Sequence, residues 1–393
     1  MKKLLLYTLS FFIYTLSFSQ QFGWKNISTN IPTEADLSDV FFVSDDEGWI
    51  TSSFHAEIYH TTDGGESFEI QSTQYPTYAI HMFDADTGYS GGAQGRVYRT
   101  TDGGNNWLAI GSTGNPPLDL DFVTASQGYA CGDYGTVYSV TSEGATNLNC
   151  QSNSTFRGIS APSVNNVWVC GGSSVFLYNG STFSGQSAPS GTYNDIHFIN
   201  NMEGWVVGNS GVIGHTTDGG ANWITQTNPD TQNRSLYGVF FLDSDNGWAV
   251  GIGGVILHTT NGGTTWTVEG NGLTTQALSG VHFTSTTNGY VVGNGKTLLN
   301  FTQVSGIGDE VEHLKFEIYP NPAKDKIQIG CSEFKTESGI IEILSLDGKK
   351  ILEKEIETGI ENIELDLNNL KSGMYFCKIS TDKKSTTKKM IME

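Results

Sequence analysis

Carboxylates at repeated positions are the first candidates for chemistry in this chain. Asp63, Asp102 and Asp218 each follow two threonines and precede two glycines, and Asn261 takes the same place in a fourth copy. A functional role would make them catalytic groups or metal ligands. A short polar side chain before two glycines also closes a tight turn by accepting hydrogen bonds from the turn's own amides. Asn261 favours the turn, because an amide does not ionise, so we predict structural roles for all four.

Imidazoles form a second repeated set. His81, His197 and His282 share one position of an apolar pattern, with Asp121 alongside, while Phe41 fills the same position in another copy. Three histidines could bind zinc if they converged. They stand in separate repeats, so we expect no metal site and no cofactor. The acidic turn at residues 84–88 lacks the distal glutamate of a calcium loop, and we expect it to be solvated.

Hydrolysis of glycosides would require two carboxylates facing one cleft. Asp119 and Asp133 are the acidic residues that stand outside the repeated pattern. The sequence has no Ser-His-Asp or phosphate-loop signature. We therefore assign no catalytic residue and keep a glycoside hydrolase as an alternative.

These residues are positioned by a repeat of about 40 residues. A Gly-aromatic step returns at intervals of 40, 40, 39, 37, 43 and 42 residues, with room for four short strands in each copy. A four-stranded repeat of this length is the blade of a β-propeller. The steps are Gly48-Trp49, Gly88-Tyr89, Gly128-Tyr129, Val167-Trp168, Gly204-Trp205, Gly247-Trp248 and Gly289-Tyr290.

The fold class predicted is all-β, a seven-bladed β-propeller over residues 20–301. The seventh copy has no Asp turn and no Trp after it, while residues 22–28 look like an outer strand with its Trp and nothing before it. We predict that this N-terminal strand completes blade seven and so closes the ring. Closure removes exposed sheet edges, which an exported β protein must protect.

A binding face is expected where the second-to-third-strand turns and the connections between blades gather. The positions that break the repeat there combine aromatic rings with amides and a few charges, as sites for sugars or protein loops do. The candidates are Tyr78, Asp119, Asp133, Tyr134, Arg157, Asn209, Tyr237 and Asn294.

Charge and targeting signals limit the function classes. The formal net charge of −20 argues against a nucleic-acid partner, since phosphate contacts require clustered Lys and Arg. Residues 1–19 read as a signal peptide, with Lys2 and Lys3 before an apolar run, and no later stretch predicts a membrane span in the mature chain. The five cysteines are too scattered for a disulfide framework, but whether Cys131–Cys170 or Cys331–Cys377 is bridged stays open.

A polar, acidic linker is predicted at residues 302–313, followed by a small β-sandwich at residues 314–393. This last domain ends on a basic run and carries Tyr319, Pro320, Asn321, Pro322, Gly348, Gly373 and Tyr375. In these motifs it resembles the type A C-terminal sorting domain of the type IX secretion system of Bacteroidota. The resemblance implies binding to that machinery and a secreted or outer-surface location.

The propeller resembles the Asp-box, or bacterial neuraminidase repeat, superfamily, and within it the photosystem II assembly/stability factor-like family. The likeness is carried by residues 204–208 and 215–223 and spans roughly residues 22–301. The export tail argues against a photosynthetic role. A sialidase of this superfamily needs an arginine cluster, and this chain has only Arg96, Arg99, Arg157 and Arg234, with no Arg-Ile-Pro motif.

Together these patterns predict an exported, monomeric propeller that binds an extracellular protein or glycan. A sialidase-type glycoside hydrolase and an assembly or stability factor for another exported complex are the alternatives.

Overall fold

The computed structural model describes residues 21–270, 272–304, 316–335, 338–345, 349–360, 362–368, 370–381 and 385–392. The chain divides into two compact units, Met1–Val304 and Ser305–Glu393. The predicted signal peptide and Gly348 lie outside the described residues. Within them, no helix combines the length and apolar character needed to cross a bilayer.

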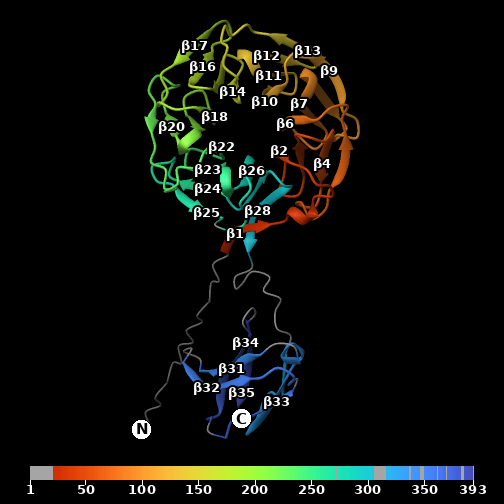
Figure 1. Cartoon of the computed structure of the whole chain (residues 1–393), viewed down its shortest axis with the longest axis vertical. Coiled ribbons are helices and arrows are strands. Elements are labelled where there is room, and N and C mark those ends of the chain that lie inside the picture. Colours follow the sequence, from red (N-terminus) through yellow and green to blue (C-terminus); the bar gives the residue numbers. More distant parts are fainter. Residues whose placement is uncertain are drawn as a thin grey trace, which may run out of the picture. The chain divides into compact units, whose positions relative to one another are not determined.

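Seven four-stranded sheets make up the described part of the first unit, and Figure 1 shows them around a ring. Blades one to three contain β2 (Leu37–Phe42), β3 (Gly48–Ser52), β4 (Glu57–Thr61), β5 (Glu69–Ser72), β6 (Thr77–Met82), β7 (Thr87–Gly92), β8 (Arg96–Thr101), β9 (Leu108–Ser112), β10 (Pro117–Thr124), β11 (Gln127–Gly132), β12 (Val137–Thr141) and β13 (Gly144–Asn147). Blades four to six contain β14 (Gly158–Ser163), β15 (Asn166–Gly171), β16 (Ser174–Tyr178), β17 (Phe183–Gln186), β18 (Tyr193–Phe198), β19 (Gly204–Gly208), β20 (Ile213–Thr216), β21 (Ile224–Thr225), β22 (Leu236–Phe241), β23 (Asn246–Gly251), β24 (Ile256–Thr260) and β25 (Thr267–Glu269).

Blade seven joins the two ends of the unit. It contains β26 (Leu278–Ser285), β27 (Asn288–Gly293), β28 (Thr297–Val304) and, as its outer strand, β1 (Gln21–Asn26). Strand β1 pairs antiparallel with β28. The predicted propeller end at residue 301, and with it the linker start at 302, is therefore too early, because β28 continues to Val304 opposite Gln21.

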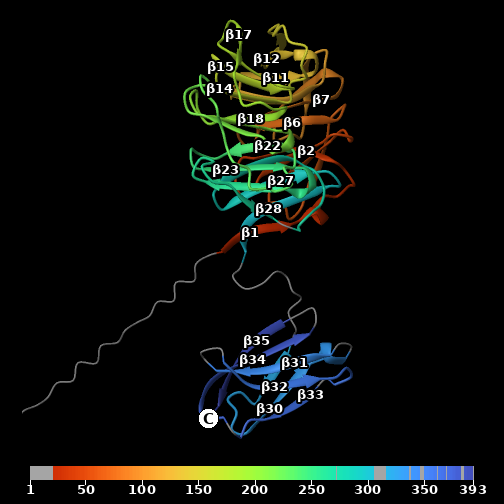
Figure 2. The same ribbon diagram turned by 60° about the vertical axis from the view of Figure 1, so that its left-hand side comes forward.

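Inner strands such as β6, β18 and β22 lie around the centre of the ring in Figure 1, and Figure 2 shows the same strands turned by 60°. Each inner strand contacts that of the next blade, and β26 contacts β2. Short 3₁₀ turns follow several second strands: η2 (Ala93–Gly95), η3 (Asp133–Gly135), η4 (Asn209–Gly211) and η5 (Ile252–Gly254), with η1 (Ser28–Asn30) after β1.

The Gly-aromatic step explains how neighbouring blades pack. A Cβ on Gly204 would lie 2.4 Å from the ring of Phe198 in its own blade, so only glycine fits beneath that ring. The Trp205 ring stacks on Phe241 of the next blade at 3.5 Å between centroids. Trp248 and Phe283 repeat this stack at 3.5 Å. Stacked aromatic pairs add about 1 kcal/mol beyond the area that they bury, so the repeated step fixes the blade spacing.

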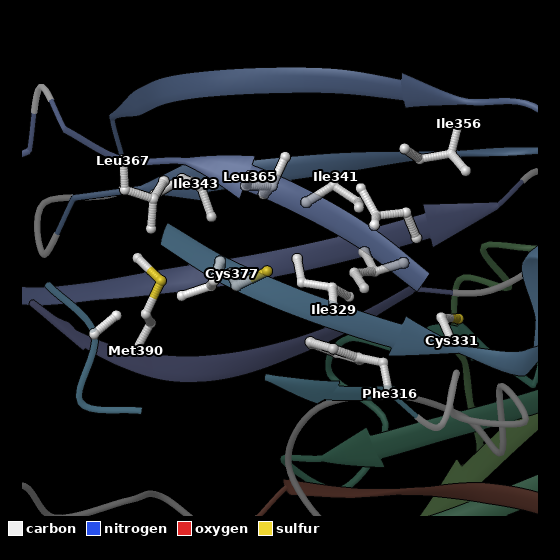
Figure 3. Close-up of a cluster of buried hydrophobic side chains, with 14 of the residues drawn as sticks. Phe316, Ile329, Cys331, Ile341, Ile343, Ile356, Leu365, Leu367, Cys377 and Met390 are labelled. Atoms are coloured by element: carbon white, nitrogen blue, oxygen red, sulfur yellow. The ribbon is translucent and has the colours of Figure 1, made fainter. Parts of the chain in front are cut away.

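The second unit packs one sheet of three strands on one of four. The strands are β29 (Phe316–Tyr319), β30 (Lys326–Cys331), β31 (Gly339–Leu344), β32 (Lys350–Ile356), β33 (Asn362–Asp366), β34 (Gly373–Thr381) and β35 (Ser385–Met392), with η6 (Ser332–Lys335) after β30. Alternate side chains of both sheets, such as Ile329, Ile341 and Leu365, share one buried core, which Figure 3 shows.

Candidate functional site

A β-bulge near the start of the inner strand shapes one end of the ring. In blade two the pairing register shifts between Thr77 and Ala79, and in blade six between Leu236 and Gly238. A bulge leaves a residue unpaired and re-aims its side chain. The residues at this position, in six bulged blades and directly before β14 in blade four, are Ser38, Tyr78, Leu118, Arg157, Asn194, Tyr237 and Ser279.

These seven residues line one hollow of about 880 Å³, here called the mouth. Ser53, Phe54, Pro116, Asp133, Thr192 and Asn209 complete its described lining. Every blade contributes at least one residue. The volume is within the range of ligand pockets, roughly 300–1,000 Å³.

Two kinds of side chain occupy the bulge position. Ser279 Oγ donates to Leu37 O at 2.8 Å, and Asn194 Nδ2 donates to Leu236 O at 2.8 Å, so both tie their blade to the next. Among the described residues, the side chains of Tyr78, Arg157 and Tyr237 have no hydrogen-bond partner. These three, with the 71 % exposed ring of Phe54, are available for a ligand.

The mouth brings together five of the eight residues proposed from the sequence: Tyr78, Asp133, Arg157, Asn209 and Tyr237. Tyr134 and Asn294 stand outside its lining, on the second-to-third-strand turns of blades three and seven. Asp119 lies lower in the channel wall. Its carboxylate accepts the amides of Leu120 and Ile159, each at 2.8 Å, and so links blade three to blade four.

Sequence reasoning did not select Ser38, Leu118, Asn194 or Ser279 as site residues. A signal for them exists, because positions 38, 78, 118, 157, 194, 237 and 279 have the same spacing as the Gly-aromatic steps. Reading the repeat in strict register would have found the whole set. The strand pattern alone did not, because a bulge shifts the alternation of side chains by one residue.

Below the mouth, Asp39, Asp119 and Asp195 occupy one level of the channel in alternate blades. Burial raises the pKa of Asp39 to about 6 and that of Asp195 to about 7. Burial, together with the charges of Asp195 and Asp39, also holds the pKa of Asp119 well above its ordinary value. Asp39 and Asp195 each accept an amide of the next blade, from Ile80 at 2.9 Å and Val239 at 2.8 Å.

One level lower, imidazole and phenyl rings alternate over five blades, from His197 in blade five to His81 in blade two. Blade three has Asp121 at this level, with Oδ1 at 3.3 Å from His81 Nδ1. The Phe41 ring lies 4.9 Å from His81 and 4.4 Å from His282 between centroids. His197 Nδ1 accepts the Phe241 amide at 3.2 Å, and His282 Nδ1 accepts the Phe42 amide at 3.4 Å. Burial lowers the pKa of His197 to about 4 and that of His282 to about 3. Neutral imidazoles here serve as acceptors between blades, and no three potential metal ligands gather anywhere in the described ranges.

The four Asp turns share one hydrogen-bond pattern. Asp218 Oδ1 accepts the Asn222 amide at 2.8 Å and the Thr216 hydroxyl at 2.9 Å. Thr216 Oγ1 in turn accepts the Gly220 amide at 3.0 Å. Asp63, Asp102 and Asn261 make the same contacts in their own turns. The oxygens therefore hold the turn together, with the preceding threonine as its buried centre.

The described cysteines are all buried, and neither Cys131–Cys170 nor Cys331–Cys377 forms a disulfide. In the second unit, Asn321 holds the last strand: its Nδ2 donates to Lys389 O at 3.0 Å, and its Oδ1 accepts the Ile391 amide at 2.9 Å. Tyr319 Oη donates to Gln328 at 2.7 Å, and Tyr375 Oη to Lys371 O at 2.9 Å. Pro320 and Pro322, both cis, flank Asn321, and Gly373 opens β34.

Solved structures with the same fold span several functions. YCF48 bound to D1 peptide aligns with a TM-score of 0.61 and 18 % identity, covering 75 % of this chain and 99 % of that one. YCF48 from Cyanidioschyzon merolae aligns at 0.60 and 21 %, covering 71 % and 98 %. Virginiamycin B lyase from Staphylococcus aureus aligns at 0.61 and 12 %, covering 73 % and 100 %. At these identities the likeness shows the propeller fold alone.

Family comparisons are more specific. Residues 317–393 match the family described as secretion system C-terminal sorting domain, so the protein is exported, to the medium or the cell surface. No curated protein matches the sequence. Residues 17–160 and 187–272 match the family described as photosynthesis system II assembly factor YCF48. Since that match covers more than half of its length, the chain belongs to the YCF48 assembly-factor family.

Proposed function

We propose that this protein is an exported binding protein that holds a segment of a partner protein in the mouth of its propeller. The observation that carries the proposal is the shared hollow, where a single repeat position supplies seven side chains, among them Tyr78, Arg157 and Tyr237. The Gly-aromatic step of the same repeat keeps its aromatic residue in all seven blades, because that ring packs one blade on the next. Variation at an accessible position is what a recognition surface requires.

The chemistry of the mouth favours a polypeptide. Phe54, Tyr78, Tyr237 and Leu118 offer rings and apolar surface, and Arg157 offers the fork of donors that pairs with carboxylates or peptide carbonyls. The relative described as bound to D1 peptide gives a precedent for a peptide on this fold. A glycan remains the second ligand class to be tested.

Catalysis is less well supported. Hydrolysis of a glycoside uses two carboxylates across a cleft, and Asp133 is the one carboxylate among the described residues of the mouth. The aspartates below it accept backbone amides. Binding without chemical turnover is therefore the function proposed.

The export route is proposed to be the type IX secretion system of a Bacteroidota bacterium, with residues 314–393 engaging the machinery after a signal peptide at 1–19. The match of residues 317–393 to the sorting-domain family supports this route. An extracellular partner follows from it, and this partner could belong to another exported complex that the propeller helps to assemble.

The test is selection of phage-displayed linear 12-residue peptides on the immobilised full chain, beside a glycan array. Selected peptides are then synthesised and titrated by fluorescence anisotropy. We expect Tyr237→Ala and Phe54→Ala to weaken binding about tenfold, since buried aromatic anchors dominate such interfaces. Met202→Ala, exposed at the opposite end of the ring, is the matched control and should bind as the unaltered chain does. Peptides that bind all variants equally, or glycans bound in place of peptides, would contradict the proposal.

A further inference from the structure

A second hollow continues from the mouth across the top of blade five. It has a volume of about 630 Å³ and shares Thr192 and Asn209 with the mouth. Its other walls include Ser210 in η4 and Thr225 in the outer strand β21. The hollow thus runs from the inner strand of the blade to its outer strand. We refer to it as the blade-five groove.

The lining of the blade-five groove differs in kind from that of the mouth. Among its described residues none is charged and none is aromatic; the polar ones carry hydroxyl or amide groups. In the described part of the chain, the side chains of Thr192, Ser210, Thr225 and Asn233 have no hydrogen-bond partner. Below them the floor is fixed, because Asn228 Nδ2 donates to Gly211 O at 2.9 Å. The groove therefore offers unpaired neutral donors and acceptors on a firm base.

The turn between the second and third strands of blade five supplies Ser210 to the groove. Ser210 has a φ of 55°, in the left-handed region that favours glycine. At the equivalent place in blade six, Gly253 has a φ of 67°. Gln94 and Tyr134 take the same position in blades two and three, each with a φ of 58°. The left-handed conformation therefore belongs to the repeated turn, and in blade five this turn places a serine side chain on the groove.

We propose that the blade-five groove binds the main chain of the partner segment as it leaves the mouth. This inference rests on the proposed function and names the part of the ligand that the groove takes: an extended, uncharged stretch of polypeptide. Neutral hydroxyls and amides pair with peptide N–H and C=O groups without selecting charged side chains. A sugar ring would present an apolar face, and the groove has no aromatic ring to cover it.

The dimensions of the blade set the length of that stretch. Three strand spacings of about 4.8 Å separate β18 from β21, which gives roughly 14 Å. An extended chain advances about 3.3 Å per residue, so about four residues cross the groove. A partner peptide should therefore have an anchoring core for the mouth and a tail of about four residues on one side of it.

The experiment uses a peptide selected on the full chain, as above, and the same peptide shortened by four residues at either end. Thr225→Trp fills the outer end of the groove from an exposed position, and Thr146→Trp, exposed on β13 of blade three, is the matched control. Circular dichroism melting verifies that both variants fold. We expect one truncation and Thr225→Trp each to weaken binding about tenfold, the two together to weaken it no further, and Thr146→Trp to change nothing.

The outcomes separate this inference from the proposed function. If Tyr237→Ala weakens binding while Thr225→Trp does not, the mouth binds the peptide and the groove assignment is overturned. If neither variant affects binding, or no peptide is selected, both proposals are wrong. A glycan whose binding is lost in Thr225→Trp would make the groove a carbohydrate site and overturn the peptide assignment.

Discussion

The two ends of the propeller differ in how much their repeated positions vary from blade to blade. At one end, the Asp turns at residues 61–65, 100–104, 216–220 and 259–263 repeat the same hydrogen bonds with the same residue types. At the other end, one repeat position holds Ser38, Tyr78, Leu118, Arg157, Asn194, Tyr237 and Ser279. The bulge position occurs in every blade and varies, whereas the Asp turn occurs in four blades and keeps its threonine and two glycines in each.

The difference follows from what each side chain satisfies. A turn threonine such as Thr216 is buried and must accept the Gly220 amide, so the local backbone dictates its identity. A bulge residue such as Tyr237 has no partner in the strand ladder and lines the mouth. Constancy thus marks internal constraint, and variation marks the surface that a ligand can use.

The largest expected effect on stability comes from a substitution between the two ends, where aromatic rings of neighbouring blades stack. Trp205→Ala removes the stack on Phe241 and the hydrogen bond from Nε1 to Gly262 O at 3.1 Å. We expect a loss of about 4 kcal/mol in the free energy of unfolding, measured by urea denaturation, because the side chain is fully buried. Trp205→Phe should lose less. A loss below about 1 kcal/mol for the alanine variant would contradict the role assigned to the stack.

Low pH should reduce the stability that the buried histidines of the channel contribute. His197 and His282 have pKa values lowered by burial to about 4 and about 3, so the unfolded chain binds more protons, and the stability that they contribute is lost as pH falls from about 6.5 towards 4. Asp39 and Asp195, whose pKa values are raised to about 6 and about 7 by burial, act in the opposite sense over this range.

A double variant isolates the histidines. Replacing both with glutamine keeps a neutral acceptor for the amides of Phe241 and Phe42. Between pH 7 and pH 4 this variant should lose less unfolding free energy than the unaltered chain, by on the order of 3 kcal/mol for each histidine replaced. Parallel stability profiles for the two proteins would show that these histidines do not titrate in the way assigned.

The end of the propeller that carries the Asp turns should lose stability when a single threonine hydroxyl is removed. Thr216→Val keeps the shape of the side chain but leaves the buried Gly220 amide without its acceptor at 3.0 Å. We expect a loss of about 2 kcal/mol in unfolding free energy, with Thr216→Ser close to the unaltered chain and peptide binding unchanged in both. If Thr216→Val weakened binding at equal folded fraction, the separation between the two ends would be wrong.

The variable end should show the smallest effect on stability. Tyr237→Ala, at 36 % exposure, should change the unfolding free energy by no more than about 0.5 kcal/mol. Peptide binding should fall about tenfold in the same variant. A large loss of stability would mean that the mouth residues are structural after all.

The sequence allowed the all-β propeller and the C-terminal domain to be predicted, because a period near 40 residues with a Gly-aromatic step admits few other folds. The residues that line the mouth were harder to predict from the sequence. Aromatic and charged breaks such as Tyr78 and Arg157 stood out by type, whereas Leu118 resembled an ordinary strand residue until the bulge re-aimed it. The aspartate in the channel, Asp119, was proposed for the mouth because sequence spacing does not show the depth of a side chain within the ring.

The central claim, that the mouth rather than the constant end holds the partner, is tested most directly by photo-crosslinking. The full chain would carry p-benzoylphenylalanine at position 237 in the mouth or at position 202 beside an Asp turn, and each form would be irradiated with a selected peptide. Mass spectrometry should find peptide attached at 237 and absent at 202. Attachment at 202 with none at 237 would contradict the account.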